Sequence, residues 1–160
     1  MNILFLTISK MLSVGNKGIY TDLMRKFRNE GHQVYIVSPT ERRDGRKTSV
    51  IEEKGVRILS VRTLNVQKTN VIEKGIGQLS IEFLYKRAIN KYFKGVNFDL
   101  ILYSTPPITF PKVLQYAKKA NPSAKTYLLL KDIFPQNAVD MGMLSKMGVK
   151  GILYKFFRAK

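Results

Sequence analysis

The chain has 160 residues, of which 44% are hydrophobic, so it is long enough to bury its own core and predicts one globular domain. It has no cysteine and a single histidine, His32, which excludes disulfides and thiolate metal sites and argues against metal catalysis. The 28 lysines and arginines exceed the 11 acidic residues and give a net charge of +17, which attracts phosphates, nucleic acid or an anionic membrane. The alternative is a solvated basic surface with no such partner.

The start of the chain is not typical of a signal peptide. Apolar residues begin at once without a basic leader, and Lys10 interrupts them. No apolar run approaches the roughly 20 residues that a membrane span needs. We therefore expect a cytoplasmic protein.

A strand, a helix and a second strand are predicted in the first part of the chain. Residues 2–8 form a short continuous apolar run, typical of a parallel strand covered on both faces. A glycine-containing loop at residues 13–18 precedes a helix that Gly31 ends. Residues 33–38 are β-branched and aromatic, and they predict a strand that Pro39 ends. We expect the two strands to be parallel and the crossover through the helix to be right-handed.

The alternation continues along the rest of the chain. Residues 40–54 are polar and predict a loop, which a third strand follows at residues 56–61. Residues 63–77 have no sustained period, and a helix is predicted at residues 79–94. The remaining predicted elements are a strand, a helix and a strand, at residues 98–103, 110–117 and 126–130. This order predicts an α/β fold: a Rossmann-like open parallel sheet with helices on both faces.

The loop after the first predicted strand contains Gly15, Asn16, Lys17 and Gly18. Doubly wound folds place ligands here, because the backbone can approach phosphates and the next helix offers unpaired amides. The spacing lacks both the three-glycine dinucleotide fingerprint and the lysine-serine ending of a P-loop, so it indicates no nucleotide cofactor. These four residues are candidate substrate-binding residues. The alternative is a flexible turn whose glycines need positive φ.

Two further polar segments follow the fourth and fifth predicted strands. Ser104, Thr105 and Pro106 come directly after one strand, and Lys131 and Asp132 after the other. The carboxyl ends of parallel strands meet at one sheet edge, the edge that binds ligands in open α/β proteins. A carboxylate there can accept a hydrogen bond from a hydroxyl or act as a base, so Asp132 is the candidate catalytic residue and the others are candidate substrate-binding residues. The alternative for Asp132 is a helix N-cap or an ion pair with Lys131.

Residues 130–139 read Leu-Lys-Asp-Ile-Phe-Pro-Gln-Asn-Ala-Val, and residues 142–144 read Gly-Met-Leu. This sequence resembles the Arg-Asp-Leu-Trp-Pro-Glu-Ser-Ala motif of glycosyltransferase family 4 enzymes of capsular and O-antigen synthesis, together with the Gly-Met-Leu that follows that motif. The opening strand, the glycine loop and the Ser-Thr-Pro-Pro-Ile-Thr of residues 104–109 are similar too, so the resemblance spans nearly the whole chain. Lys131 and Phe134 stand where the family usually has arginine and tryptophan.

The resemblance implies a GT-B enzyme, in which one Rossmann-like domain holds the acceptor and a second holds the nucleotide sugar, with retention at the anomeric carbon and no required metal. Residues 1–160 would be a truncated first domain, inactive by itself. Gly15 and Gly18 would face the diphosphate of the donor, and Asp132 would lie near the transferred sugar or the acceptor hydroxyl. The whole protein would be a retaining hexosyl- or N-acetylhexosaminyltransferase that acts on a lipid-linked saccharide in surface polysaccharide synthesis.

Two basic amphipathic stretches fit a peripheral membrane surface, which suits a lipid-linked acceptor. One follows Gly148 and the other is the predicted helix at residues 79–94; the alternative for each is a core helix with solvated lysines. Two other functions stay open. A UDP-sugar 2-epimerase has the same two-domain architecture. A nucleic-acid-binding module would explain the charge, but the sequence has no recognisable reading motif, so we expect no nucleic-acid partner.

Overall fold

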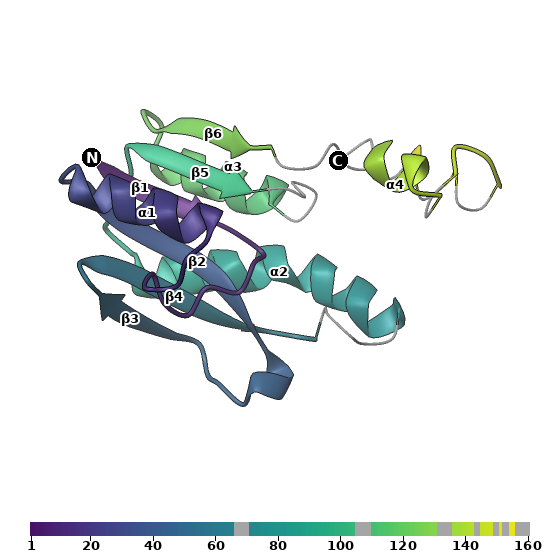
Figure 1. Cartoon of the computed structure of the whole chain (residues 1–160), viewed down its shortest axis with the longest axis horizontal. Coiled ribbons are helices and arrows are strands. Elements are labelled where there is room, and N and C mark those ends of the chain that lie inside the picture. The colour runs from purple at the N-terminus through teal and green to yellow at the C-terminus, as the bar shows by residue number, and fades with distance from the viewer. Residues whose placement is uncertain are drawn as a thin grey trace.

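A mixed sheet organises the part of the chain that the computed structural model describes, which is residues 1–65, 71–104, 110–130, 136–142, 145–148, 151 and 154–155. Within these residues six strands form one sheet in the order β3-β4-β2-β1-β5-β6 (Figure 1). The strands are β1 (Asn2–Leu6), β2 (Gln33–Glu41), β3 (Ser49–Glu53), β4 (Val56–Thr63), β5 (Leu100–Ser104) and β6 (Lys125–Leu129). The helices are α1 (Ile19–Asn29), α2 (Val71–Tyr92), α3 (Pro111–Ala120) and α4 (Gln136–Asp140), with a 3-10 turn at Arg42–Asp44.

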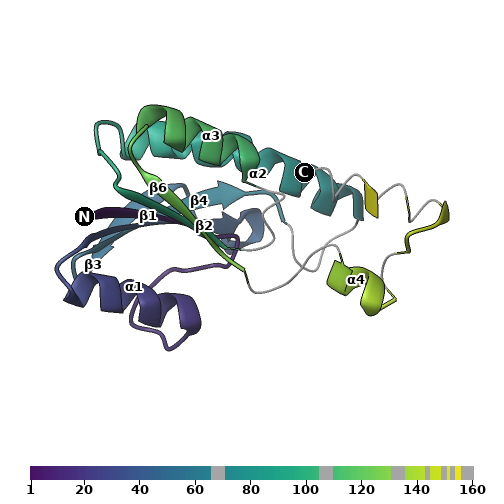
Figure 2. The same ribbon diagram turned by 90° about the horizontal axis from the view of Figure 1, so that it is seen from above.

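Helices cover both faces of the sheet (Figure 2). On one face, Ile3 and Phe5 of β1 belong to a buried cluster with Met24 of α1. On the other face, Leu4 of β1 belongs to a cluster with Tyr85 of α2. Successive strand residues point to opposite faces, so burial of both faces explains why β1 is apolar throughout. The predicted Rossmann-like α/β class is confirmed.

The parallel part of the sheet also agrees with the sequence prediction. The parallel pairs are β1 with β2, β1 with β5, β2 with β4 and β5 with β6. The predicted stop of the first helix is confirmed: Gly31 has a φ of 81°, and the His32 amide donates to the Phe27 carbonyl over 3.1 Å. Only a residue without Cβ adopts such a φ at low cost, which is the reason for glycine at this position.

The predicted loop at residues 40–54 is wrong. β2 continues through Pro39 to Glu41, and β3 pairs with β4 in the antiparallel direction. β1 ends at Leu6, opposite Val37, so β2 has a strand on only one side beyond that point. A proline is tolerated there, because the missing N–H leaves no ladder bond broken on the open side.

The β3–β4 hairpin closes through a two-residue turn. Lys54 and Gly55 both have positive φ, 50° and 75°, as the tight turns of hairpins require. Lysine is rare in this conformation, and Asn-Gly or Asp-Gly is the usual signal. The sequence therefore lacks the usual signal for this turn. The edge strand β3 is polar and exposed, so it also lacks the apolar alternation that would indicate a strand.

The helix predicted at residues 79–94 is longer at its start, because α2 begins at Val71. Gly75 and Gly77 each lower the helix propensity of the first turns by about 1 kcal/mol relative to alanine. The sequence therefore gives no clear sign of a helix in these turns. Most of the amphipathic stretch after Gly148 lies outside the described residues. No helix in the described segments is both long and apolar enough to cross a membrane.

Candidate functional site

The sheet order reverses between β1 and β5: β2 and β4 lie on one side of β1, and β5 and β6 on the other. Open α/β sheets bind ligands outside the carboxyl ends of the strands at such a reversal. Ser104 is the last residue of β5 and lies at this edge, as predicted. Its predicted neighbours Thr105, Pro106, Lys131 and Asp132 lie outside the described residues, so their roles stay predictions.

Ser104 is buried at this edge, with 1% of its surface exposed. Its hydroxyl donates to Oγ1 of Thr7 over 3.0 Å, and Thr7 directly follows β1. The hydroxyl of Tyr85 donates to the Thr7 carbonyl over 2.8 Å, and burial raises the pKa of the Tyr85 phenol well above its ordinary value. In the structure Ser104 therefore joins β5 to the start of the loop after β1, and a role in substrate binding stays a prediction.

The loop between β1 and α1 does not stay at the carboxyl edge. Figure 1 shows it passing from the end of β1 toward β4 before it returns to α1. The amide of Val14 donates to the Glu53 carboxylate over 2.8 Å, and Glu53 pairs with Val56, the first residue of β4. Gly15 therefore lies near the amino end of β4, whereas Ser104 lies at the carboxyl end of β5. Both residues come after parallel strands in the sequence, which predicts that they share the carboxyl edge, and this juxtaposition is wrong.

Glu53 holds this loop in place. Its carboxylate accepts hydrogen bonds from the Ser13 hydroxyl and the Val14 amide, both at 2.8 Å. These bonds, the one from Ser13 first, hold the pKa of the Glu53 carboxyl below its ordinary value. Arg25 of α1 donates to the carbonyls of Val14 and Asn16. The loop is thus fixed from the hairpin on one side and from α1 on the other.

Neither Gly15 nor Gly18 has a φ in the left-handed region that favours glycine, so the turn interpretation of these glycines is wrong. Gly18 is extended, with φ at 167°. A Cβ at Gly15 would lie 3.3 Å from Oε1 of Glu53, and a Cβ at Gly18 would lie 3.3 Å from Oγ1 of Thr21. Glycine is favoured at both positions by the close approach of a neighbouring side chain rather than by backbone conformation.

A polar pocket of about 300 Å³ lies between this loop and the start of α1. Its lining residues are Ser9, Lys10, Met11, Leu12, Ser13, Asn16, Lys17, Gly18, Ile19, Tyr20 and Thr21. Lys10 forms an ion pair with Asp44 at 2.8 Å, which holds the pKa of the Asp44 carboxyl below its ordinary value. Three of the four predicted loop residues, Asn16, Lys17 and Gly18, line the pocket, and Gly15 does not.

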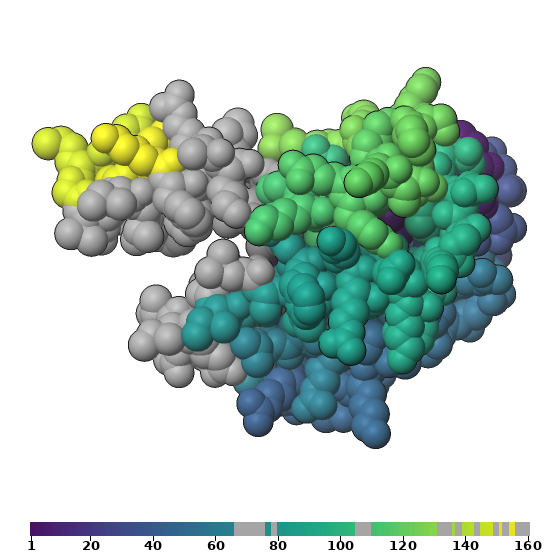
Figure 3. All heavy atoms as spheres, turned by 180° about the vertical axis from the view of Figure 1, so that it is seen from behind, coloured from purple at the N-terminus to yellow at the C-terminus, as the bar shows by residue number. Residues whose placement is uncertain are grey.

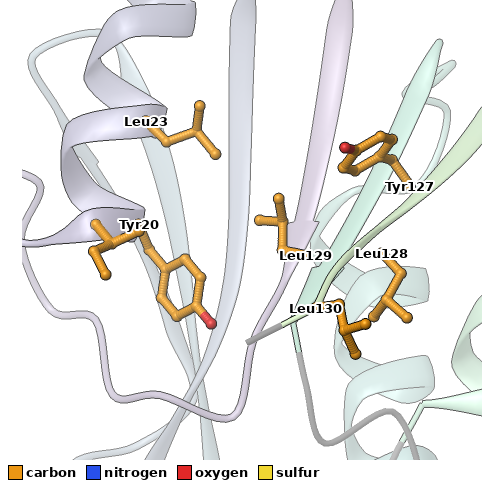
Figure 4. A pocket seen from close by; sticks show the side chains of 7 residues that line it. Tyr20, Leu23, Tyr127, Leu128, Leu129 and Leu130 are labelled. Atoms are coloured by element: carbon orange, nitrogen blue, oxygen red, sulfur yellow. The ribbon is translucent and has the colours of Figure 1, made fainter. Parts of the chain in front are cut away.

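An apolar pocket of about 370 Å³ adjoins the polar one between α1 and β6 (Figure 4). Ile19 and Tyr20 line both pockets. Leu23 completes the α1 side, and residues 127–130 form the other wall. Leu130, the last of these residues, directly precedes the Lys131-Asp132 segment in the sequence.

The chemistry of these pockets favours an anionic group beside an apolar one. Gly18 makes no side-chain cap for α1, so the first turn presents amide groups and the positive end of the helix dipole near Lys17. Asp22 in the same turn pairs with Arg25, which removes part of its opposing charge. Among the described residues, no group of three or more His, Cys, Asp or Glu side chains could hold a metal ion.

Sequence reasoning missed the side chains that shape this site, namely Thr7, Arg25, Glu53 and Tyr85. Thr7 stands inside an otherwise apolar run, and a polar residue at a strand end is a usable signal. Tyr85 falls on the buried stripe of its helix and looks like any core aromatic. Glu53 contacts Val14 from 39 residues further along the chain, and Arg25 does so from 11 residues further along. No spacing rule indicates such contacts.

None of the known family models, curated proteins or solved structures matches this chain. The fold, the geometry of the two pockets and the motif at residues 130–139 therefore carry the functional inference.

Proposed function

We propose that residues 1–160 form the acceptor-side domain of a retaining glycosyltransferase, the first half of a GT-B enzyme. The whole protein would transfer a hexose or N-acetylhexosamine from a nucleotide sugar to a lipid-linked saccharide. The observation that carries the proposal is the position of the motif: residues 130–139 directly follow β6, so the chain enters the motif at the carboxyl edge of a Rossmann-like sheet. Ligands of open α/β sheets lie at that edge.

The polar pocket supports a ligand that carries phosphate. Lys17 and the uncapped start of α1 together provide a positive charge and backbone donors at one place. In the proposal, Asn16, Lys17 and Gly18 approach the diphosphate of the nucleotide sugar when a second domain closes over this face. Gly15 acts indirectly, because it packs against Glu53 and keeps the loop close to the hairpin.

Asp132 is the proposed catalytic residue. Within the proposal, its carboxylate accepts a hydrogen bond from the acceptor hydroxyl and so orients it toward the anomeric carbon. Lys131, Thr105 and Pro106 are the further residues proposed to contact the acceptor. Ser104 contributes indirectly, because its hydroxyl joins β5 to Thr7.

The acceptor in this proposal is an amphiphile, with a polyprenyl chain, a diphosphate and a saccharide. Such a substrate requires the enzyme to work at the inner face of the membrane from the cytoplasm. The apolar pocket between α1 and β6, lined by Tyr127 and Leu129 among others, supports contact with an apolar face of the acceptor saccharide.

The test is a transfer assay on the full-length protein that contains this chain. Labelled UDP- and GDP-sugars are incubated with a polyprenyl-diphosphate-linked saccharide, and the lipid fraction is analysed by mass spectrometry and NMR. We expect one added sugar with retained anomeric configuration. A nucleotide sugar converted to its 2-epimer, with no labelled lipid, would overturn the proposal in favour of an epimerase.

A second measurement uses the 160-residue chain itself. Calorimetry with UDP- and GDP-sugars should give no measurable binding, because most contacts with the donor would come from the second domain. Micromolar binding of a nucleotide sugar to this chain would contradict an acceptor-side assignment.

A further inference from the structure

The face of the sheet opposite α1 carries a concentrated positive charge. α2 and α3 lie side by side on this face, which Figure 3 shows from outside. Residues 76–94 contain four cations and residues 111–120 contain three, and the side chains of all seven are exposed. They are Lys86, Arg87, Lys91, Lys94, Lys112, Lys118 and Lys119.

The same two segments contain one acidic residue, Glu82, and it points inward. Glu82 is 9% exposed and accepts a hydrogen bond from the Lys112 amide over 2.9 Å. The carboxylate thus holds the start of α3 against α2 and does not face solvent. The outer surface of both segments is therefore cationic without an interspersed negative charge.

Two large apolar side chains of α2 are exposed on the same helix as four of these cations. Phe83 is 65% exposed and Ile76 is 55% exposed. Ile76, Phe83 and Arg87 are spaced by seven and four residues, which places them on one outward stripe of α2. Exposed apolar side chains within a basic helical face are typical of helices that lie in a membrane interface.

The two helices are held together, so the face is a preformed surface. The hydroxyl of Tyr116 donates to Oδ1 of Asn90 over 2.9 Å, and Nζ of Lys86 lies 5.3 Å above the Tyr116 ring. Beneath them, the rings of Tyr85 and Phe110 pack 5.8 Å apart. A rigid surface presents its charges together and orders few side chains on binding.

We propose that the α2–α3 face docks on an anionic phospholipid bilayer, with the seven cations among the headgroups and with Phe83 and Ile76 reaching the acyl boundary. The charge of the face is complementary to acidic headgroups. An aliphatic Ile76 on the same outward stripe as Phe83, two helical turns away, suits a hydrocarbon boundary better than a nucleic acid, which would need stacking aromatics or base-reading polar groups. The face lies across the sheet from α1 and its pockets, so vesicle binding by this face and sugar transfer by the proposed enzyme are tested separately (Figure 2).

The test measures binding of the 160-residue chain to vesicles of phosphatidylcholine mixed with phosphatidylglycerol, by co-sedimentation. We expect binding that falls with added salt and no binding to pure phosphatidylcholine. Each cation should contribute roughly fivefold to the partition constant, which corresponds to about 1 kcal/mol. The variant with Lys86→Gln, Arg87→Gln, Lys91→Gln and Lys94→Gln should bind at least about fiftyfold more weakly.

A charge-matched control carries Lys26→Gln, Arg46→Gln, Lys54→Gln and Lys125→Gln, four exposed cations on other elements. It has the same net charge and should lose no more than about fivefold. Equal losses in the two variants would overturn the proposal, because net charge rather than this face would then control binding. Melting curves of both variants verify that each one folds.

A fluorescent reporter tests the orientation. The chain has no tryptophan, so Phe83→Trp provides a single probe, and Tyr127→Trp on β6 provides a control of similar exposure. With anionic vesicles the emission of the first should shift to the blue and that of the second should not. Binding of a short DNA duplex without any binding to the vesicles, or a shift at Tyr127→Trp alone, would overturn the inference.

Discussion

The clearest quantitative prediction concerns Glu53, which fixes the loop after β1. The Ser13 hydroxyl donates to Oε1 of Glu53 and the Val14 amide donates to Oε2, so in Glu53→Gln one of these two donors faces the amide NH2 group in place of an acceptor. A hydrogen bond to a charged group contributes about 1.5–3 kcal/mol, and partial exposure of Glu53 reduces this. We expect a loss of about 1–2 kcal/mol, or a melting temperature about 3–6 °C lower for a domain of this size.

The effect depends on pH in a defined direction. Because folding holds the pKa of the Glu53 carboxyl below its ordinary value, the ionised group stabilises the folded state above that ordinary value. The stability difference between the native chain and Glu53→Gln should therefore be complete at pH 7. It should shrink as the pH falls below about 4.5 and vanish once Glu53 is protonated in the folded state.

The matched control is Glu52→Gln. Glu52 is the preceding residue, is largely exposed and lies 3.5 Å from Arg57, so its loss should change stability by less than about 0.5 kcal/mol. Thermal denaturation at several pH values measures the stabilities, and hydrogen exchange of the Val14 amide reports on the loop itself. Exchange of that amide should be about tenfold faster in Glu53→Gln. If the two variants have the same melting temperature and the exchange rate of the Val14 amide is unchanged, Glu53 does not hold the loop in place.

Four other substitutions test the remaining elements of the site. Tyr85→Phe leaves a buried backbone carbonyl without its donor and should cost about 1 kcal/mol by chemical denaturation. Gly15→Ala places a Cβ within 3.4 Å of two side chains and should also cost about 1 kcal/mol, whereas an unchanged melting curve would show that the loop yields freely. Lys17→Gln should weaken pyrophosphate binding to this chain severalfold in an NMR titration without lowering the melting temperature. Asp132→Asn in the full-length protein should reduce turnover by about ten- to a thousandfold at constant stability, and normal turnover would remove this residue from the catalytic site.

Local patterns predicted the parallel part of the fold because each of its elements carries its own signal. The apolar runs of β1 and β2 are continuous since both faces of these strands are buried, and Gly31 ends α1 since only glycine accepts that φ easily. The β3–β4 hairpin carries no such signal. Its turn uses Lys54-Gly55, and its edge strand is exposed and polar, so pairing with β4 rather than propensity makes it a strand.

The candidate site divides in the same way. The sequence by itself determined the class of fold, the positive charge and the segments that leave the carboxyl ends of the strands, because composition and hydrophobic period are local properties of the chain. Only the tertiary structure decided that the loop after β1 turns back toward the hairpin, so that Gly15 meets Glu53 while Ser104 is buried against Thr7. Val14 and Glu53 are 39 positions apart in the sequence, and Thr7 and Ser104 are 97 positions apart. Contacts between such distant residues depend on how the sheet brings its elements together.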